Sequence, residues 1–133
     1  MALQEAVIAI ILDKSYENVV LGMGKPGTKF YSDKWHILGE KINSGETDIE
    51  ALIRCGREEV GLGIHVIRML AAHISPTGRN ARWYECQTPE EKLTPGSDLD
   101  DAKWVPKMQV PGELDHETVL LLPEAIKEYF GIS

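Results

Sequence analysis

Cysteines, basic side chains and long hydrophobic runs are all scarce in this 133-residue chain. Its only cysteines, Cys55 and Cys86, do not have the spacing of a metal site, so we expect reduced thiols in a cytoplasmic protein. The apolar run over residues 6–12 is far too short to cross a bilayer, which predicts no membrane anchor. Residues 1–14 lack a basic leader, so we expect no secretory signal.

The charge balance is acidic, because 21 Asp and Glu residues against 14 Lys and Arg give a net charge of −7. This charge disfavours nucleic-acid polymers and anionic membranes as partners. Small nucleotide derivatives remain possible ligands, since metal ions can mediate their binding. Acidic residues concentrate at 90–101 and 113–117, where we expect solvated loops. The sequence predicts no particular oligomeric state.

The length predicts one domain, residues 1–133, that is large enough for a hydrophobic core. The apolar, β-branched-rich run at 6–12 predicts a strand buried on both faces, with a hairpin partner at 19–23. Strands on both sides of a central helix predict a mixed sheet between helices. Further strands are expected at 64–74, 82–87 and 103–105, and a C-terminal helix is expected at 124–130.

The most informative segment, residues 35–63, predicts a glycine-bearing loop followed by a helix. Thr47 and Glu50 have the spacing of a capping box, which predicts that the helix begins there. Gly61 and Gly63 predict its end. The helical period predicts that one face is buried. The residues on that face are Ile49, Leu52, Ile53, Gly56 and Val60.

Two adjacent carboxylates, Glu58 and Glu59, lie away from this predicted buried face. Cys55 precedes them by three and four positions, so we expect all three side chains to share one side of the helix. Adjacent carboxylates on a rigid helix suit hard cations such as Mg²⁺. The alternative is an ordinary solvated helix face.

Six residues of this segment stand at a distinctive spacing: Glu46, Arg54, Glu58, Glu59, Gly61 and Leu62. The flanking residues Trp35, Gly39, Lys41 and Gly45 complete the pattern. Residues 40–62 thereby resemble the box of the Nudix hydrolase family. The resemblance implies an α/β fold, the Nudix-type α/β/α sandwich with a mixed β-sheet.

The resemblance also implies an activity, the hydrolysis of a pyrophosphate bond with Mg²⁺ or Mn²⁺ as cofactor. Glu58 and Glu59 are then the metal ligands, and one of them is the general base. Arg54 is expected to pair with Glu46 and to brace the loop against the helix. The catalytic residues implied are thus Arg54, Glu58 and Glu59, and those implied for substrate binding are Gly39, Lys41 and Pro76.

Three positions depart from the family pattern: Glu40 replaces a glycine, Cys55 replaces a glutamate and Gly56 replaces an apolar residue. Cys55 touches the chemistry, because a neutral thiol is a poor ligand for Mg²⁺. The metal site is then weakened, re-supplied by another carboxylate, or lost, and a Cys55→Glu change is expected to improve it. The candidates for another carboxylate are Glu40, Glu85 and Glu113.

The substrate is less sharply defined. Pro76 lies fifteen residues beyond Gly61, which resembles the ADP-ribose pyrophosphatase subgroup, whereas the chain length equally suits nucleoside triphosphates. Residues 24–34 carry three lysines, so they form either a phosphate-contacting loop or a solvated one. Tyr31, Trp35 or Trp83 could stack on a base or belong to the core. Two function classes stay open: a metal-dependent pyrophosphohydrolase, and a Nudix-fold module that binds a nucleotide or protein without turnover.

Overall fold

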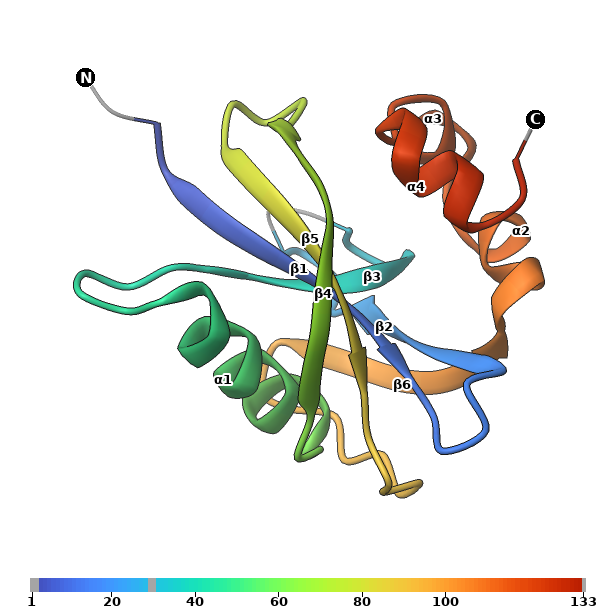
Figure 1. Ribbon diagram of the computed structural model, residues 1–133. Coiled ribbons are helices and arrows are strands. Elements are labelled where there is room, and N and C mark those ends of the chain that lie inside the picture. The colour runs from blue at the N-terminus through green and yellow to red at the C-terminus, as the bar shows by residue number, and fades with distance from the viewer. Residues whose placement is uncertain (1–2, 29–30, 133) are drawn as a thin grey trace.

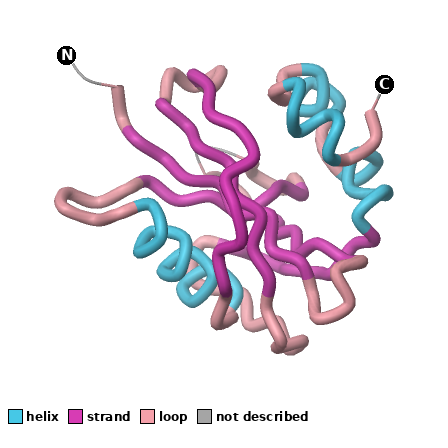
Figure 2. The backbone as a smooth tube through the Cα atoms, in the orientation of Figure 1, coloured by secondary structure: helices cyan, strands magenta, loops and turns pink. Residues whose placement is uncertain are grey.

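The computed structural model describes residues 3–28 and 31–132, and its centre is a mixed sheet of six strands with helices on both faces (Figures 1 and 2). The strand order is β4-β5-β1-β3-β2-β6. Only β1 and β5 pair in parallel, and the other neighbours are antiparallel. The strands are β1 Glu5–Leu12, β2 Asn18–Gly24, β3 Trp35–Lys41, β4 His65–Ile74, β5 Asn80–Gln87 and β6 Leu99–Pro106. The helices are α1 Asp48–Val60, α2 Val110–Glu113, α3 His116–Leu120 and α4 Glu124–Tyr129, with a 3-10 turn at Lys107–Gln109.

Two hydrophobic clusters lie on opposite faces of the sheet, and β1 contributes to both. Val7 and Ala9 pack in the cluster beneath α1, whereas Ile10 packs in the cluster beneath the C-terminal helices. This alternation follows from the two-residue period of a strand. The predicted sandwich with a mixed sheet and the predicted two-sided burial of β1 are both confirmed. No helix in the described parts of the chain is long and apolar enough to span a membrane.

The predicted limits of α1 are confirmed. The Thr47 hydroxyl accepts a hydrogen bond from the Glu50 amide at 3.1 Å, and the Glu50 carboxylate accepts one from the Thr47 amide at 2.9 Å. Gly61 ends the helix in the left-handed region, with φ of 70°. These contacts satisfy backbone groups that the helix leaves unpaired at its ends.

The predicted buried face of α1 is partly wrong, since Ile49 is 54% exposed. The reason lies at the first turn, where the Asp48 carboxylate accepts hydrogen bonds of 2.7 and 2.8 Å from Arg82 on β5. Asp48 therefore faces the sheet, and the adjacent Ile49 faces solvent. The buried residues are Ala51, Leu52, Cys55, Gly56 and Val60.

Two stretches of the chain differ from the sequence prediction. Residues 35–41 were expected to be a loop but form β3, which lies between β1 and β2. The acidic run at 113–117, expected to be a solvated loop, includes parts of α2 and α3. In the expected loop at 24–34, residues 25–28 and 31–34 contain turns and an isolated bridge, while residues 29 and 30 lie outside the described part.

The connection from β5 to β6, residues 88–98, packs against the end of α1. The Thr94 amide donates to the Val60 carbonyl at 2.9 Å, and the Gly96 amide donates to the Glu59 carbonyl at 2.8 Å. A Cβ atom on Gly96 would lie only 1.9 Å from the Glu58 carbonyl oxygen. The backbone at Gly96 can therefore approach the helix only because it carries no side chain. This contact fixes the turn that bears Glu58 and Glu59.

We predict that Gly96→Ala lowers the free energy of unfolding by about 2 kcal/mol, because the new methyl group must push the loop off the helix. Urea unfolding measures the effect. The matched control is Gly112→Ala, where a Cβ meets no atom within 4 Å and where the change should stay within about 0.5 kcal/mol. If Gly96→Ala and Gly112→Ala lowered the free energy of unfolding equally, the close approach of Gly96 to α1 would not contribute to stability.

Candidate active site

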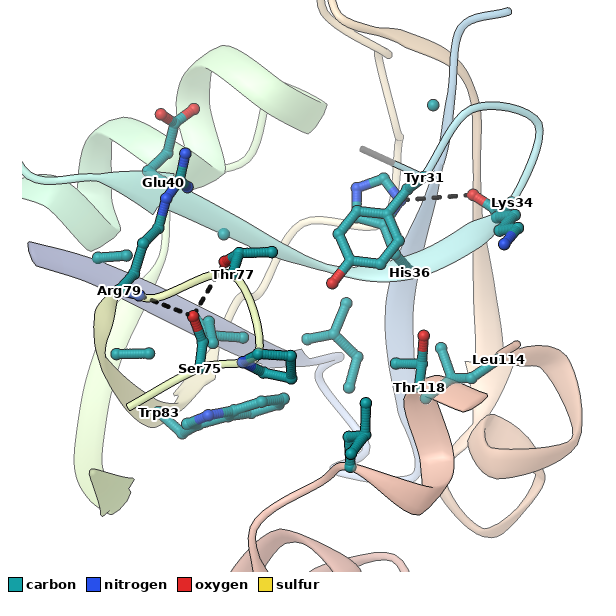
Figure 3. A pocket seen from close by; sticks show the side chains of 18 of the residues that line it. Tyr31, Lys34, His36, Glu40, Ser75, Thr77, Arg79, Trp83, Leu114 and Thr118 are labelled. Atoms are coloured by element: carbon teal, nitrogen blue, oxygen red, sulfur yellow. Dashed lines mark hydrogen bonds between the residues drawn. The ribbon is translucent and has the colours of Figure 1, made fainter. Parts of the chain in front are cut away.

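A cleft of about 790 Å³ is lined by residues from widely separated parts of the chain. They come from β1, β3, the 24–34 loop, the turn between β4 and β5, the end of α1, and the segment around α3. Figure 3 shows Glu40 and Arg79 on one side of this cleft and Tyr31, His36, Leu114 and Thr118 on the other. The cleft thus has a charged side and a side with aromatic and apolar groups.

The two adjacent glutamates of α1 lie in different surroundings. Glu59 is partly buried and lines the cleft. The Glu58 side chain is 57% exposed, and its carboxylate lies 3.8 Å from Arg54. The predicted pair is therefore split between a sheltered carboxylate and a solvated one.

Glu59 lies against a second carboxyl group, that of Glu40 on β3. Burial raises the pKa of Glu59, and the pKa is raised further by a hydrogen bond with Glu40 and by the negative charges of Glu40, Asp98 and Glu58. Two carboxylates so close together repel each other unless a proton or a cation lies between them. The arrangement therefore favours a bound cation.

Arg54 joins α1 to β3 and to the preceding loop. Its guanidinium donates to both carboxylate oxygens of Glu46, at 2.9 and 3.0 Å, which agrees with the pairing expected from the sequence. It also donates to the Lys41 carbonyl at 2.7 Å and to the Glu40 carboxylate at 3.3 Å. Arg54 does not line the cleft. Its contacts position other residues, because its donors are directed into the protein.

The expectation that Cys55 shares one exposed side of the helix with both glutamates is only partly right, because Cys55 lies on the side of Glu59 but is buried, whereas Glu58 is solvated. Its side chain is 0% exposed and belongs to the cluster beneath α1. Burial raises the pKa of the thiol well above its usual range, and the charges of Glu40 and Glu59 raise it further. The thiol therefore stays protonated at neutral pH and offers a metal ion little.

Of the three candidate carboxylates, only Glu40 lies near Glu59. Glu85 accepts hydrogen bonds from Tyr129 at 2.6 Å and Arg68 at 3.1 Å. Glu113 pairs with Lys103 at 3.0 Å. Glu40 lines the cleft, whereas Glu85 and Glu113 do not.

The three residues expected to bind substrate all line the cleft. Gly39 lies in β3, where a Cβ would come within 3.2 Å of the Val7 carbonyl oxygen. Lys41 ends the same strand and is exposed. Pro76 belongs to the turn between β4 and β5. The fold brings these residues together with Glu59, although they come from three separate segments.

Several lining residues were not expected from the sequence. Asp98 stands in the acidic run that was expected to be solvated, yet it lines the cleft and contributes to the high pKa of Glu59. Tyr31 stacks on His36, with 4.6 Å between ring centroids and 11° between planes. Burial lowers the pKa of His36, so this ring is neutral at pH 7. Only the position of Tyr31 among lysines in a loop could have indicated such a role.

The structure places the three aromatic candidates for base stacking in different surroundings. Tyr31 and Trp83 line the cleft, whereas Trp35 does not. Trp83 is largely buried, and its indole donates to Nε2 of His73 at 3.0 Å. Trp35 instead packs under the Lys103 ammonium, 4.2 Å from the ring centroid. Tyr31 is therefore the exposed aromatic surface of the cleft.

The oxygen donors of the cleft fit a small, hard cation. Among residues 3–28 and 31–132, no three His, Cys, Asp or Glu side chains form a ready-made metal-binding group. Mg²⁺ usually keeps several waters and takes one or two carboxylates from the protein, which matches the Glu40–Glu59 pair. The buried thiol of Cys55 would add no suitable ligand.

Comparisons with known proteins agree with this geometry. Residues 2–124 match the family described as the NUDIX domain. The fold is similar to that of the MutT protein from Methanosarcina mazei Go1, with 18% identity, a TM-score of 0.71, and coverage of 96% of this chain and 90% of that one. It is also similar to a NUDIX-family hydrolase from Clostridium perfringens, with 17% identity, a TM-score of 0.72, and coverage of 96% and 99%.

A third similar structure is a UDP-X diphosphatase, with 19% identity and a TM-score of 0.71, which covers 100% of this chain and 66% of that one. Curated protein sequences give no match. At these identities the structural likeness concerns the fold, and the family follows from the match over residues 2–124.

The burial of Cys55 adds a stability cost to the Cys55→Glu change that the sequence did not indicate. A carboxylate at this position must enter the core beside Glu40 and Glu59, so we predict a loss of at least about 3 kcal/mol in the free energy of unfolding. Cys55→Ala is the steric control and should cost about 1 kcal/mol. Chemical denaturation of both variants measures the difference. A Cys55→Glu protein as stable as Cys55→Ala would show that the new carboxylate reaches solvent.

Proposed function

Since this chain belongs to the NUDIX domain family, we propose that residues 1–133 form one Nudix domain that hydrolyses a pyrophosphate bond in a nucleoside diphosphate derivative, with Mg²⁺ or Mn²⁺ as cofactor. The observation that carries this proposal is the Glu40–Glu59 carboxyl pair on the wall of the cleft. Such a pair favours a cation at the place where a diphosphate also needs one.

In this proposal Glu58 and Glu59 hold the metal. The bound ion would supply charge neutralisation at the phosphoryl oxygens and lower the pKa of a water molecule. Burial and acidic neighbours raise the pKa of Glu59 to about 8, so this carboxyl group holds a proton at neutral pH unless a cation takes its place. With the cation bound, Glu58 or Glu59 would also act as the general base. Arg54, expected from the sequence among the catalytic residues, acts as a positioning residue that holds the glutamate-bearing helix against β3.

The remaining cleft residues would orient the substrate. The Lys41 ammonium offers positive charge to a diphosphate. The backbone of Gly39 permits close approach, and Pro76 shapes the opposite turn. The exposed ring of Tyr31, supported by its stack on His36, offers a flat surface to a base or sugar. These features support a small nucleotide derivative as the partner, without a nucleic-acid polymer or a membrane.

A second function is favoured by one observation, the neutral buried thiol at position 55. If the cation site is too weak for turnover, the domain binds a nucleotide or a protein without hydrolysis. The two free cysteines, both buried, support a reducing cytoplasmic location in either case.

We predict that Glu58→Gln/Glu59→Gln weakens Mn²⁺ binding by about tenfold or more, and that it lowers hydrolysis by about 10²–10⁴-fold. Titration calorimetry and a hydrolysis assay provide the two measurements. The matched control is Glu124→Gln/Glu128→Gln, which removes the same charge from α4. Equal Mn²⁺ affinity in the wild type and the α1 double variant would refute the metal assignment.

We further predict that ADP-ribose is cleaved at least as well as nucleoside triphosphates, on the evidence that Pro76 lines the cleft. A screen of ADP-ribose, a UDP derivative and the common triphosphates, with Mg²⁺ and with Mn²⁺, decides this when substrates and products are separated by anion-exchange chromatography. A clear preference for a triphosphate with ADP-ribose untouched would show that Pro76 is only a turn residue. Binding without turnover of any compound would favour the second function.

A further inference from the structure

We propose that Glu40 is a metal ligand of this protein and supplies, from β3, the carboxylate that Cys55 does not supply from α1. The inference rests on the proposed function, because it concerns the same cation. It goes further in assigning the ligand to a position where the family pattern has a glycine.

The strand places Glu40 beneath α1. Leu38, two residues earlier in β3, is fully buried in the cluster that α1 covers. Side chains two apart in a strand point to the same face, so Glu40 also points toward α1. Figure 3 shows its carboxylate directed toward that helix. The strand is held by pairing of Glu40 with Val7 of β1, so this position is rigid.

The helix presents the complementary residues. Cys55 and Glu59 are four apart and therefore lie on one side of α1, one turn from each other. Glu40 and Glu59 both line the cleft, and the Glu40 carboxylate lies 3.3 Å from the guanidinium of Arg54 on the same helix. Glu40 thus lies beside the space that a longer acidic side chain at position 55 would have to share. The two departures from the family pattern compensate, because one removes a carboxylate and the other restores it from the facing strand.

Arg54 does not remove Glu40 from this role. The guanidinium donates to one oxygen of Glu40 at 3.3 Å, a longer contact than the 2.9 and 3.0 Å bonds with Glu46. A carboxylate has several acceptor sites, so Glu40 can accept from Arg54 and still offer lone pairs to a cation. Its side chain is 18% exposed, and it lines the cleft with Glu59.

The test is Mn²⁺ affinity, measured without substrate from the electron paramagnetic resonance signal of the free ion. Glu40→Gln keeps the size of the side chain and an acceptor for Arg54 but removes the charge. We expect it to weaken Mn²⁺ binding by about tenfold or more, and we expect the same of Glu59→Gln. Circular dichroism and thermal unfolding establish that each variant is folded.

Glu46→Gln is the matched control. Glu46 is the stronger partner of Arg54, with two hydrogen bonds, but it does not line the cleft. If Glu40 acts only by holding Arg54, Glu46→Gln must weaken Mn²⁺ binding at least as much as Glu40→Gln. If Glu40 is a ligand, Glu46→Gln lowers stability and weakens Mn²⁺ binding clearly less than Glu40→Gln does.

The outcomes separate this inference from the proposed function. If Glu40→Gln binds Mn²⁺ as tightly as the wild type, while Glu59→Gln binds it weakly and the wild type hydrolyses a compound of the screen, only the role of Glu40 is overturned. A wild type that neither binds Mn²⁺ nor hydrolyses any compound of the screen overturns both. Glu40-dependent binding without hydrolysis supports the ligand and points to a binding module. A crystal soaked with Mn²⁺ in which the ion contacts Glu59 but not Glu40 would also overturn the inference.

Discussion

The site depends on the way one guanidinium, that of Arg54, joins a helix to a strand. It donates to the Glu46 carboxylate, the Lys41 carbonyl and the Glu40 carboxylate, and these contacts raise its own pKa. A planar group with five donors fixes the angle as well as the distance between the segments it joins. It also offsets part of the negative charge that Glu40 brings to Glu59.

The limits of α1 could be predicted because the residues that set them are close together in the sequence. The capping box at Thr47 and the glycine at Gly61 lie within or beside α1, and both limits of the helix were predicted from them. β3 was missed, because its burial does not alternate and its end contains Gly39 and Glu40. It is a strand because β1 and β2 provide hydrogen bonds on both sides, which is a property of the tertiary fold. The short α2 and α3 were missed as well. Val110 of α2 and the partly buried Val119 of α3 belong to the cluster that also contains Ile10 of β1, and spacing along the chain does not show this contact.

The features of the candidate active site also fall into those with local causes in the sequence and those that depend on the tertiary fold. The pairing of Arg54 with Glu46 followed from spacing along the chain, whereas the burial of Cys55 depends on the rotation of α1. α1 is held against the sheet by contacts that are distant in sequence, such as that of Asp48 with Arg82, which is 34 residues away. Gly56 was interpreted as a missing apolar side chain, yet a Cβ there would lie 2.9 Å from the Ile64 side chain. The segment that follows the helix already fills that space, so glycine is the residue that fits.

The two-sided burial of β1 limits how the chain can change in length. Val7 and Ala9 face one cluster while Ile10 and Leu12 face the other, and the strand pairs with β5 along its whole length. Deleting or inserting one residue would exchange the two sets and would also shift the end of the strand where the cleft lies. Natural length variation is therefore expected at the exposed turn over residues 13–17, with residues 5–12 constant in number. Gain or loss of residues in that turn leaves the pairing and the cleft in place.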